Sequence, residues 1–327
     1  MNEGEDPVAR RPPGPRSFRA NPASYAAPVI THITASDADF EENRPRMFGI
    51  AYRMLGSAAE AEDTVQEAYL RWAAADREEI EHPGAWLAKV VTNLCLNTLT
   101  SARVRREAYV GPWLPEPVLT ADGTLGPLES AEQRDSVSMA LLVLLEQLTP
   151  VERAVYVLRE AFAYSHREIA GLLDLTEANC RQLYRRAAGR VTADRPAAPE
   201  PRFAPDPERW QSLVETFMTA ARGGDLTRLE GLLTADVRFV SDGGGVVNAA
   251  LRPILGREKV ARFAIGVLKK FAGDLPVSVA EINGVPALLF GETGVLLVEF
   301  ENGLVSGLST VLNPEKLEFL QRQLSHS

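Results

Sequence analysis

The sequence of 327 residues contains little cysteine, little histidine and no long apolar run. Its two cysteines, Cys95 and Cys180, fall inside helical patterns, which argues against a disulfide framework and fits buried thiols in a reducing cytoplasm. The four histidines are scattered without the spacing of metal ligands, so we expect no metal site and no other cofactor. No apolar run approaches the ~20 residues that cross a bilayer, so we expect a cytoplasmic protein with no membrane partner.

Basic residues are also fewer than acidic ones, 35 against 44, so the net charge is -9. The helical pattern after Thr176 is an exception, since it carries Arg181, Arg185 and Arg186 beside one acid, Glu177. A helix fits the major groove of DNA, where Arg binds guanine or the flanking phosphates. We therefore interpret it as a DNA-recognition helix; the alternative is a solvated helix on which arginines happen to cluster.

Two proline-rich stretches divide the chain into three blocks, as its length also suggests. The N-terminal stretch is rich in Pro and Arg and lacks the apolar core of a signal peptide. The predicted divisions are a disordered tail at 1–35, a helical domain at 36–107, a linker at 108–129, a second helical domain at 130–192, a linker at 193–205 and a third domain at 206–327.

Helix start signals are frequent in the first two blocks. Ser/Thr-x-x-Glu patterns that begin at Ser57, Thr149 and Ser165 predict capping boxes, and Gly56 predicts the end of the helix before the first of them. A further cap at Thr176 follows Ser165 at the spacing of a helix-turn-helix.

The two helical blocks resemble a known family. Sigma regions 2.1–2.2 are matched by AYRMLGSAAEAEDTVQEAYLRW, regions 2.3–2.4 by HPGAWLAKVVTNLCLNTLTSARVRRE, and region 4 by LTPVERAVYVLREAFAYSHREIAGLLDLTEANCRQLYRRA. With these matches in this order, the chain resembles the bacterial sigma factors of the extracytoplasmic-function (ECF) class. The resemblance implies an alternative sigma factor without catalytic residues, which binds core RNA polymerase and directs transcription initiation at promoter DNA.

The resemblance also implies contacts with polymerase, in which region 2.2 docks on the clamp helices of the β′ subunit and region 4 reaches the β flap. The residues that match the docking motif are Asp63, Gln66 and Glu67. Acidic residues outnumber basic ones between Asp37 and Thr92, which suits a protein partner and would repel DNA. A merely solvated helix face is the alternative for these residues.

Promoter contacts follow from the same resemblance. The loop from Asp76 to Gly84 lies where such chains capture a flipped base. The residues implied for the −10 element are Asn93, Asn97, Arg103, Arg105 and Arg106, and those implied for the −35 element are Arg181, Gln182, Arg185 and Arg186. Asn reads base edges and Arg holds phosphates. The chain departs from the family pattern at Asn97 and Thr100, where an acid and a base are expected.

The third block begins with helical patterns in DPERWQSLVETFMTAARGGD, TRLEGLLTAD and GREKVARFAIGVLKKF. Four strand-like runs follow: VSVAEI, PALLF, GVLLVEF and GLVSGLSTVL. This order resembles the NTF2/SnoaL-like cone, an α+β fold. The expected protein is thus multi-domain, with all-α region 2 and region 4 domains and an α+β cone.

Four short motifs, SDGGG, NPEKL, YVGPWLPEP and RQLYRRA, resemble the ECF subgroup with a fused SnoaL-like domain. The resemblance implies regulation in cis, with no separate anti-sigma factor required. We expect the cone to meet the linker between regions 2 and 4, because glycines allow close backbone approach and Trp113 is a stiff apolar anchor. The residues of this predicted contact are Trp113, Asp242, Gly243, Gly244, Gly245, Asn313, Pro314 and Lys316.

Two other functions remain as alternatives. A SnoaL-type cyclase or isomerase with a DNA-binding appendage would need an acid/base pair, yet the only histidine of the block is His326, and Asp236 and Asp242 have no visible partner. A helix-turn-helix regulator that acts without polymerase would not need the region 2.2 motif. The cone is also a candidate site for a small apolar ligand.

Overall fold

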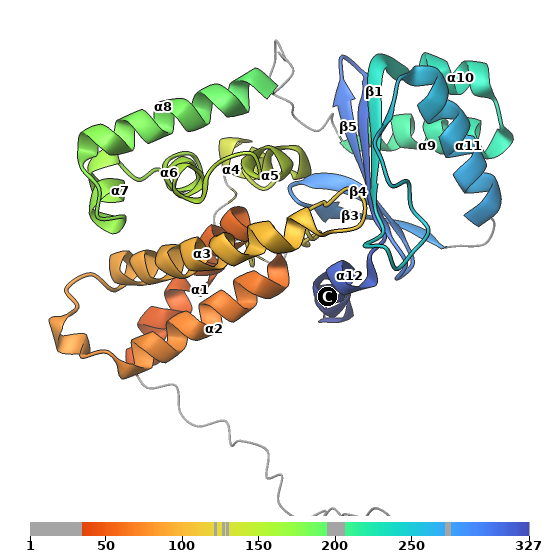
Figure 1. Cartoon of the computed structure of the whole chain (residues 1–327). Coiled ribbons are helices and arrows are strands. Elements are labelled where there is room, and N and C mark those ends of the chain that lie inside the picture. Colours follow the sequence, from red (N-terminus) through yellow and green to blue (C-terminus); the bar gives the residue numbers. More distant parts are fainter. Residues whose placement is uncertain are drawn as a thin grey trace, which may run out of the picture.

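The computed structural model describes residues 35–120, 123–125, 128, 131–194, 207–271 and 276–326. Most of the predicted tail at 1–35 and of the predicted linker at 193–205 therefore lies outside the described residues. Two helical groups lie on one side of the molecule, and a sheet with its own helices lies on the other (Figure 1).

The first helical group consists of α1 (Ala35–Leu55), α2 (Ala58–Ala74), the short 3-10 helix η1 (Arg77–Glu79) and α3 (Pro83–Glu107). Helix α1 ends as predicted at Gly56, which adopts a φ of +66° that favours glycine. Ser57 then caps α2, because its side chain accepts a hydrogen bond from the Glu60 backbone N–H. The three helices pack around buried side chains such as Trp72.

The second helical group consists of α4 (Ala131–Asp135), α5 (Met139–Leu145), α6 (Pro150–Glu160), α7 (His166–Leu172) and α8 (Glu177–Asp194). The predicted capping boxes at Thr149 and Ser165 are confirmed, with reciprocal bonds to Glu152 and Glu168. Thr176 accepts a bond from the first turn of α8. Helices α7 and α8 form the predicted helix-turn-helix.

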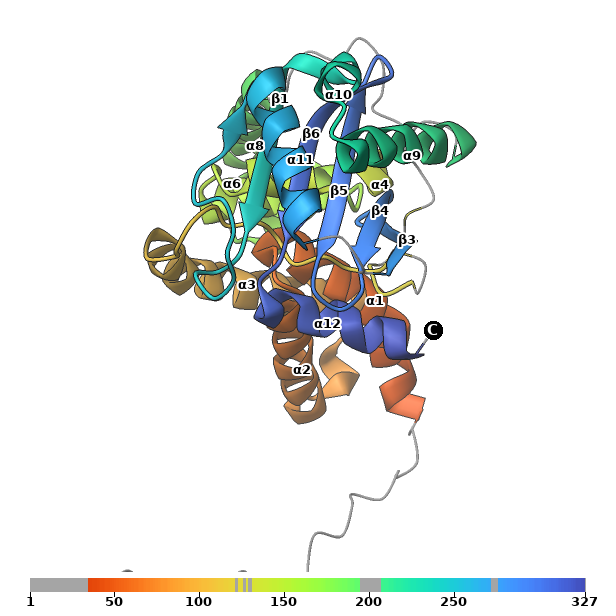
Figure 2. The ribbon, with the colours of Figure 1, turned by 90° about the vertical axis from the view of Figure 1, so that its right-hand side faces the viewer.

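The C-terminal part, here called the cone (residues 207–326), starts with helices and continues into a sheet. Its elements are α9 (Pro207–Gly223), α10 (Leu226–Gly231), β1 (Leu233–Asp242), β2 (Ile254–Leu255), α11 (Arg257–Phe271), β3 (Val277–Ile282), β4 (Val285–Phe290), β5 (Val295–Glu301), β6 (Leu304–Val311) and α12 (Pro314–His326). The described strands form one six-stranded sheet in the order β2-β1-β6-β5-β4-β3. Strands β1 and β6 are parallel, and the other neighbours are antiparallel (Figure 2).

The helix predicted through TRLEGLLTAD is wrong in its second half. The helix ends at Gly231, and β1 begins at Leu233. Buried apolar residues after this point include Val237 and Phe239, two positions apart, which is the period of a strand. Pairing with β6 supplies the hydrogen bonds that the helix would have made. The sequence did not predict β1 or β2, whereas the four predicted strand runs correspond to β3, β4, β5 and β6.

Both faces of the sheet are covered. Along β5, Leu296 and Val298 belong to the core under α9, α10 and α11, whereas Val295 and Leu297 belong to the core on the opposite face. That opposite face packs against Leu114 of the linker, α5 and α12. The cone is therefore attached to the linker and to α5 through this face of its sheet.

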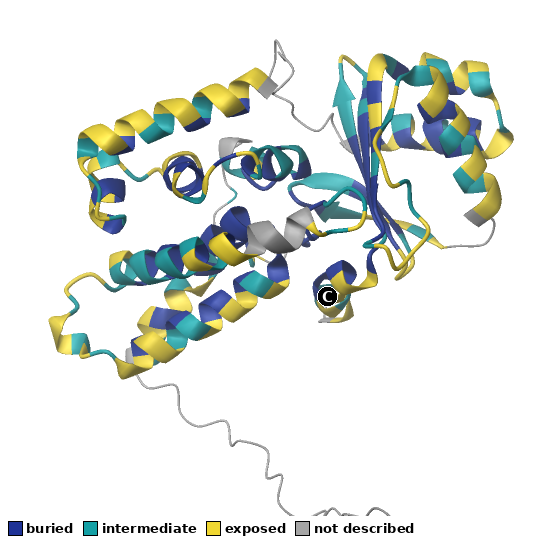
Figure 3. Ribbon diagram, in the orientation of Figure 1, coloured by how far each residue is buried: buried dark blue, intermediate teal, exposed yellow. Residues whose placement is uncertain are grey.

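The two helical groups share a single continuous core, to which α12 contributes Phe319. The ring of Phe319 stacks on Phe48 of α1 with centroids 5.5 Å apart. The buried residues on the helices of both groups belong to this one core (Figure 3). Within the described part of the chain, every helix is too short or too polar to cross a bilayer.

Candidate functional site

The residues predicted to bind polymerase lie on the outer face of α2. Asp63 and Gln66 are exposed, and Glu67 is half-buried and pairs with Arg71 one turn further along, with 3.1 Å between Oε1 and Nε. On the neighbouring position, Glu62 pairs with Arg322 of α12 at 2.5 Å. The C-terminal helix of the cone therefore lies at the border of this acidic face.

The residues predicted to read the −10 element lie on α3. Asn97 is exposed and Asn93 is half-buried; they lie four residues apart, on one face of the helix. Arg103, Arg105 and Arg106 belong to the end of α3, but their side chains lie outside the described residues.

The residues predicted to read the −35 element lie on α8, and all four are exposed: Arg181, Gln182, Arg185 and Arg186. Arg181 forms an ion pair with Glu177 on the same helix. The half-buried Tyr184 fixes the opposite side, because its hydroxyl donates to Glu160 Oε1 at 2.7 Å and its ring packs on Tyr156. The recognition helix thus presents a basic face while its other face is held on α6.

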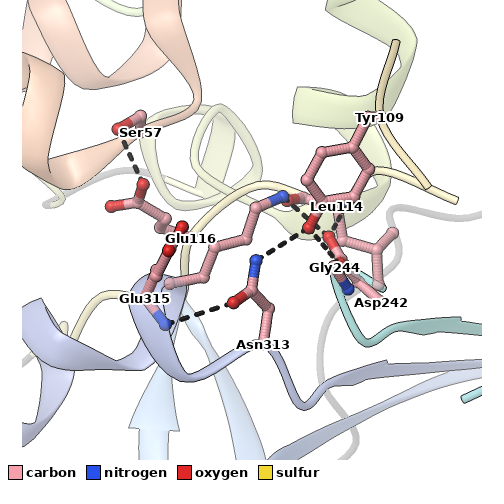
Figure 4. Close-up of polar contacts among 9 residues, drawn as sticks. Ser57, Tyr109, Leu114, Glu116, Asp242, Gly244, Asn313 and Glu315 are labelled. Atoms are coloured by element: carbon pink, nitrogen blue, oxygen red, sulfur yellow. Dashed lines mark hydrogen bonds and ion pairs between the residues drawn. The ribbon is translucent and has the colours of Figure 1, made fainter. Parts of the chain in front are cut away.

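Asp242, at the end of β1, is the centre of a group of polar contacts between the cone and the linker (Figure 4). Its carboxylate is fully buried; Oδ2 accepts from Lys316 Nζ at 2.7 Å and from the Leu114 backbone N–H at 2.8 Å. Oδ1 accepts from the Tyr109 hydroxyl at 2.6 Å and from the Gly244 backbone N–H at 3.1 Å. Burial and the bond to Asp242 raise the pKa of Tyr109.

Lys316, in the first turns of α12, completes this arrangement. Its ammonium group donates to the Leu114 carbonyl at 2.5 Å and lies over the rings of Tyr109 and Trp113, 4.7 and 4.2 Å from their centroids. The ring of Trp113 also covers Gly56, where an added Cβ would lie 2.8 Å from the indole. The linker is therefore held between the cone and the junction of α1 and α2.

Asn313 also contacts Tyr109, because its Nδ2 donates to the Tyr109 hydroxyl at 2.9 Å. Its Oδ1 caps α12. Gly244 has a φ of +61°, and a side chain there would overlap Asn313. Of the predicted contact residues, the structure brings together Trp113, Asp242, Gly244, Gly245, Asn313 and Lys316, with Gly245 against Val110. Gly243 instead packs against the loop that follows it. Pro314 is exposed at the first position of α12. We call Tyr109, Leu114, Asp242, Asn313 and Lys316 the cone–linker junction.

Glu116, within the linker motif, is a functional candidate that the sequence did not reveal. Its buried carboxylate accepts from Ser57 Oγ at 2.7 Å and from the backbone N–H groups of Ala58 and Ala59 at 2.8 and 3.1 Å. It thus caps α2, which carries the acidic face. Burial raises the pKa of Glu116, although these hydrogen bonds oppose the shift.

Asn283, in the turn between β3 and β4, is the second missed residue. It is fully buried, and its Nδ2 donates to the Tyr52 hydroxyl at 2.6 Å and to the Val137 carbonyl at 2.8 Å, while its Oδ1 accepts from the Val118 N–H at 3.1 Å. Tyr52 belongs to α1, Val118 to the linker and Val137 to the second helical group. One side chain of the cone therefore bonds to all three, and the Asn-Gly pair of a hairpin turn was the available sequence signal.

Buried arginines join the two helical groups directly. Arg53 of α1 donates to Ser136 Oγ at 2.8 Å and to the Leu125 carbonyl at 2.9 Å. Arg153 of α6 donates to the Met54 carbonyl and to Glu146, both at 2.7 Å. Burial lowers the pKa of both guanidinium groups, which remain protonated at neutral pH.

The cone shows no acid/base pair among its described residues. Asp236 is exposed on β1, and Asp242 is committed to the cone–linker junction. The side chain of His326 lies outside the described residues. Likewise, no cluster of three His, Cys, Asp or Glu side chains in the described ranges could hold a metal ion.

Two protein families match the helical part of the chain: Sigma-70 region 2 matches residues 40–105, and Sigma-70, region 4 matches residues 138–191. The ECF RNA polymerase sigma factor SigJ of Mycobacterium tuberculosis (strain ATCC 25618 / H37Rv) is 36% identical over 292 residues, which are 85% of this chain and 92% of SigJ. The probable ECF RNA polymerase sigma factor SigI of Mycobacterium tuberculosis (strain CDC 1551 / Oshkosh) is 30% identical over 295 residues, 88% of this chain and 96% of SigI.

The fold is similar as well. The crystal structure of Mycobacterium tuberculosis SigJ matches with a TM-score of 0.68 and 33% identity, over 85% of this chain and 97% of that chain. These similarities extend through the cone, which the two sigma-70 families do not reach.

Proposed function

The chain belongs to the extracytoplasmic-function RNA polymerase sigma factors, and from this membership we infer how its surfaces serve promoter-specific transcription initiation. The first helical group is region 2, the second is region 4, and the cone is an NTF2-like extension. Sigma factors bind core polymerase and promoter DNA and are not enzymes. The cyclase alternative is therefore not favoured, and the protein acts where polymerase acts, in the cytoplasm.

The acidic face of α2 is the proposed docking surface for the β′ clamp helices, through Asp63, Gln66 and Glu67. Exposure of Asp63 and Gln66 supports this assignment, and so does the rigid cap that Glu116 gives to α2. Region 4 is the proposed partner of the β flap. On DNA, Asn93 and Asn97 face the −10 element, with Arg103, Arg105 and Arg106 beside them, and the exposed face of α8 reads the −35 element.

The relative position of regions 2 and 4 is the observation that carries the proposed regulation. Asp174, in the helix-turn-helix, lies 2.9 Å from Lys89 on α3, so the two DNA-reading modules touch. On a promoter, the −10 and −35 elements are centred about 25 base pairs apart, roughly 85 Å at 3.4 Å per base pair. One protein in this compact arrangement cannot read both elements, so we take the compact form to be inactive.

The cone is the part that stabilises the compact form. Asp242 and Lys316 fix the linker, and Asn283 bonds to region 2, the linker and the start of region 4. A short tether between region 4 and the cone gives a local concentration of order mM, so these contacts form without a separate anti-sigma factor. Polymerase and promoter DNA, by holding region 2 and region 4 at separate sites, together open the arrangement.

The test is transcription in vitro with core polymerase, on DNA that wild-type holoenzyme selects from a random-sequence library. Reversing Asp63 and Glu67 to Lys should abolish co-purification with core polymerase and all transcription. The matched control is Glu258→Lys, because Glu258 is exposed and pairs with Arg262 four residues on, as Glu67 does with Arg71. Undiminished polymerase binding by the double variant removes the docking assignment, and failure of wild-type protein to select any DNA removes the proposed function.

A further inference from the structure

The face of α3 that carries Asn93 and Asn97 also carries Lys89, one turn earlier. The three residues are spaced by four, so their side chains project from one side of the helix. Within the described part of the chain, the amide groups of Asn93 and Asn97 bind no other side chain. Lys89, in contrast, contacts another part of the chain.

Lys89 contacts the turn of the helix-turn-helix. Lys89 Nζ donates to Asp174 Oδ1 at 2.9 Å and approaches the Gly171 carbonyl at 3.4 Å. Asp174 itself has a φ of +53°, and its side chain is largely exposed. A carboxylate and a carbonyl oxygen around an ammonium group reproduce the oxygen environment that a DNA phosphate offers to Lys.

From this geometry, and resting on the proposed function, we propose that Lys89 contacts the promoter backbone beside the −10 element and that Asp174 takes the place of that phosphate in the compact form. The Asp174 carboxylate lies where the phosphate would bind, and two anions in that position repel each other, so promoter binding and the Lys89–Asp174 pair compete. Region 4 thereby masks the start of the DNA-reading face of region 2. The cone holds region 4 in the position where this exchange takes place.

The contribution of the Lys89–Asp174 pair to the compact form follows from the exposure of both side chains to solvent. An ion pair as open to solvent as this one favours the compact form about fivefold or less. It is thus weak enough for DNA to displace. Losing one phosphate contact lowers the slope of log affinity against log salt by about 0.7–0.9, for single-stranded and duplex DNA respectively.

The experiment uses full-length protein assembled with core polymerase, and fluorescein-labelled DNA that the wild-type holoenzyme has selected. Affinity is measured at several salt concentrations for wild type, Lys89→Gln, Asp174→Asn and the double variant. Asn tolerates a positive φ, so Asp174→Asn preserves the turn. The matched controls are Lys259→Gln on α11 and Asp236→Asn on β1, both exposed on the cone.

We expect Lys89→Gln to reduce the salt slope by about one ion, and Asp174→Asn to raise affinity by about two- to fivefold with the slope unchanged. In the Lys89→Gln background, Asp174→Asn should not change the affinity, because the ammonium group that Asp174 binds is absent. An unchanged salt slope for Lys89→Gln, or an equal gain from Asp174→Asn in both backgrounds, overturns this inference alone. A wild-type holoenzyme that selects no DNA overturns the proposed function and this inference with it.

Discussion

Two of the ion pairs at the interfaces of this chain differ in their surroundings: Lys316–Asp242, within the cone, holds the linker, and Lys89–Asp174 joins regions 2 and 4. Lys316 and Asp242 are 8% and 0% exposed and lie among aromatic rings and backbone groups. Lys89 and Asp174 are 40% and 78% exposed, at the edge of the contact between regions 2 and 4. Removing one partner of a buried pair costs about 3–5 kcal/mol, whereas an exposed pair contributes about 0–1 kcal/mol.

The comparison extends to the two interfaces. The cone–linker junction is a polar network, in which the loss of one group leaves others buried without partners. The contact between regions 2 and 4 is mostly a shared apolar core, which also encloses the buried Arg53 and Arg153, with the Lys89–Asp174 pair at its border. Apolar surface accepts any partner of similar shape, whereas a buried polar network accepts only its own groups. Regions 2 and 4 can therefore separate in the promoter-bound holoenzyme while the cone–linker junction persists.

The largest expected effect comes from breaking the buried pair. Asp242→Ala leaves the Lys316 ammonium buried without its carboxylate, so we expect a loss of about 3–5 kcal/mol in the free energy of unfolding, measured by urea denaturation. Asp236→Ala is the matched control on the same strand; its side chain is exposed, and its effect should stay within about 0.5 kcal/mol. A loss under about 1 kcal/mol for Asp242→Ala would contradict the comparison.

An intermediate effect is expected at the β3–β4 turn. Asn283→Ala removes the bonds to the Tyr52 hydroxyl and the Val137 carbonyl and places Ala at a φ of +54°, so we expect a loss of about 2–4 kcal/mol. Asn302→Ala is the control, because Asn302 has a φ of +52° in the equivalent Asn-Gly turn but is exposed. The difference between the two variants isolates the buried bonds, and equal losses would show that they contribute nothing.

The smallest effect concerns the pH dependence of stability. Burial raises the pKa of Glu116 in the folded protein, so its contribution to stability is fully present below the ordinary value of 4.5 and is lost as pH rises through the raised pKa. Glu116→Gln has no such loss, and we expect its stability relative to wild type to increase over that window. Urea denaturation from pH 4 to pH 7 measures this, and a difference that stays constant with pH would refute it.

Periodicity and capping predicted most of the fold, because both are local. Ser165 and Thr149 cap their helices where the sequence placed them, and the four late strands lie where their apolar runs predicted. Strand β1 was not predicted, because its formation depends on pairing with a parallel strand, β6, that lies far along the chain.

The site was predictable in part for the same reason. The motifs around Asp242 and Lys316 marked the cone–linker junction, but Glu116 and Asn283 gain their roles only from groups that folding brings to them, such as Ser57 and Tyr52. Lys89 looks like an ordinary surface lysine until region 4 is placed beside it. The roles assigned to Asp63 and Arg185 remain predictions, since neither polymerase nor DNA is part of the structure.

The central claim is that the free protein is compact and that polymerase and promoter DNA separate regions 2 and 4. Spin labels attached to Asp39→Cys on α1 and Thr192→Cys on α8 measure that separation directly, and the native Cys95 and Cys180 are buried and should take no label. We predict one narrow distance distribution for the free protein, a broader one for Asp242→Ala, and a shift of tens of Å to longer distance in the holoenzyme on promoter DNA. A free protein whose distances already match those of the promoter-bound holoenzyme would contradict the account.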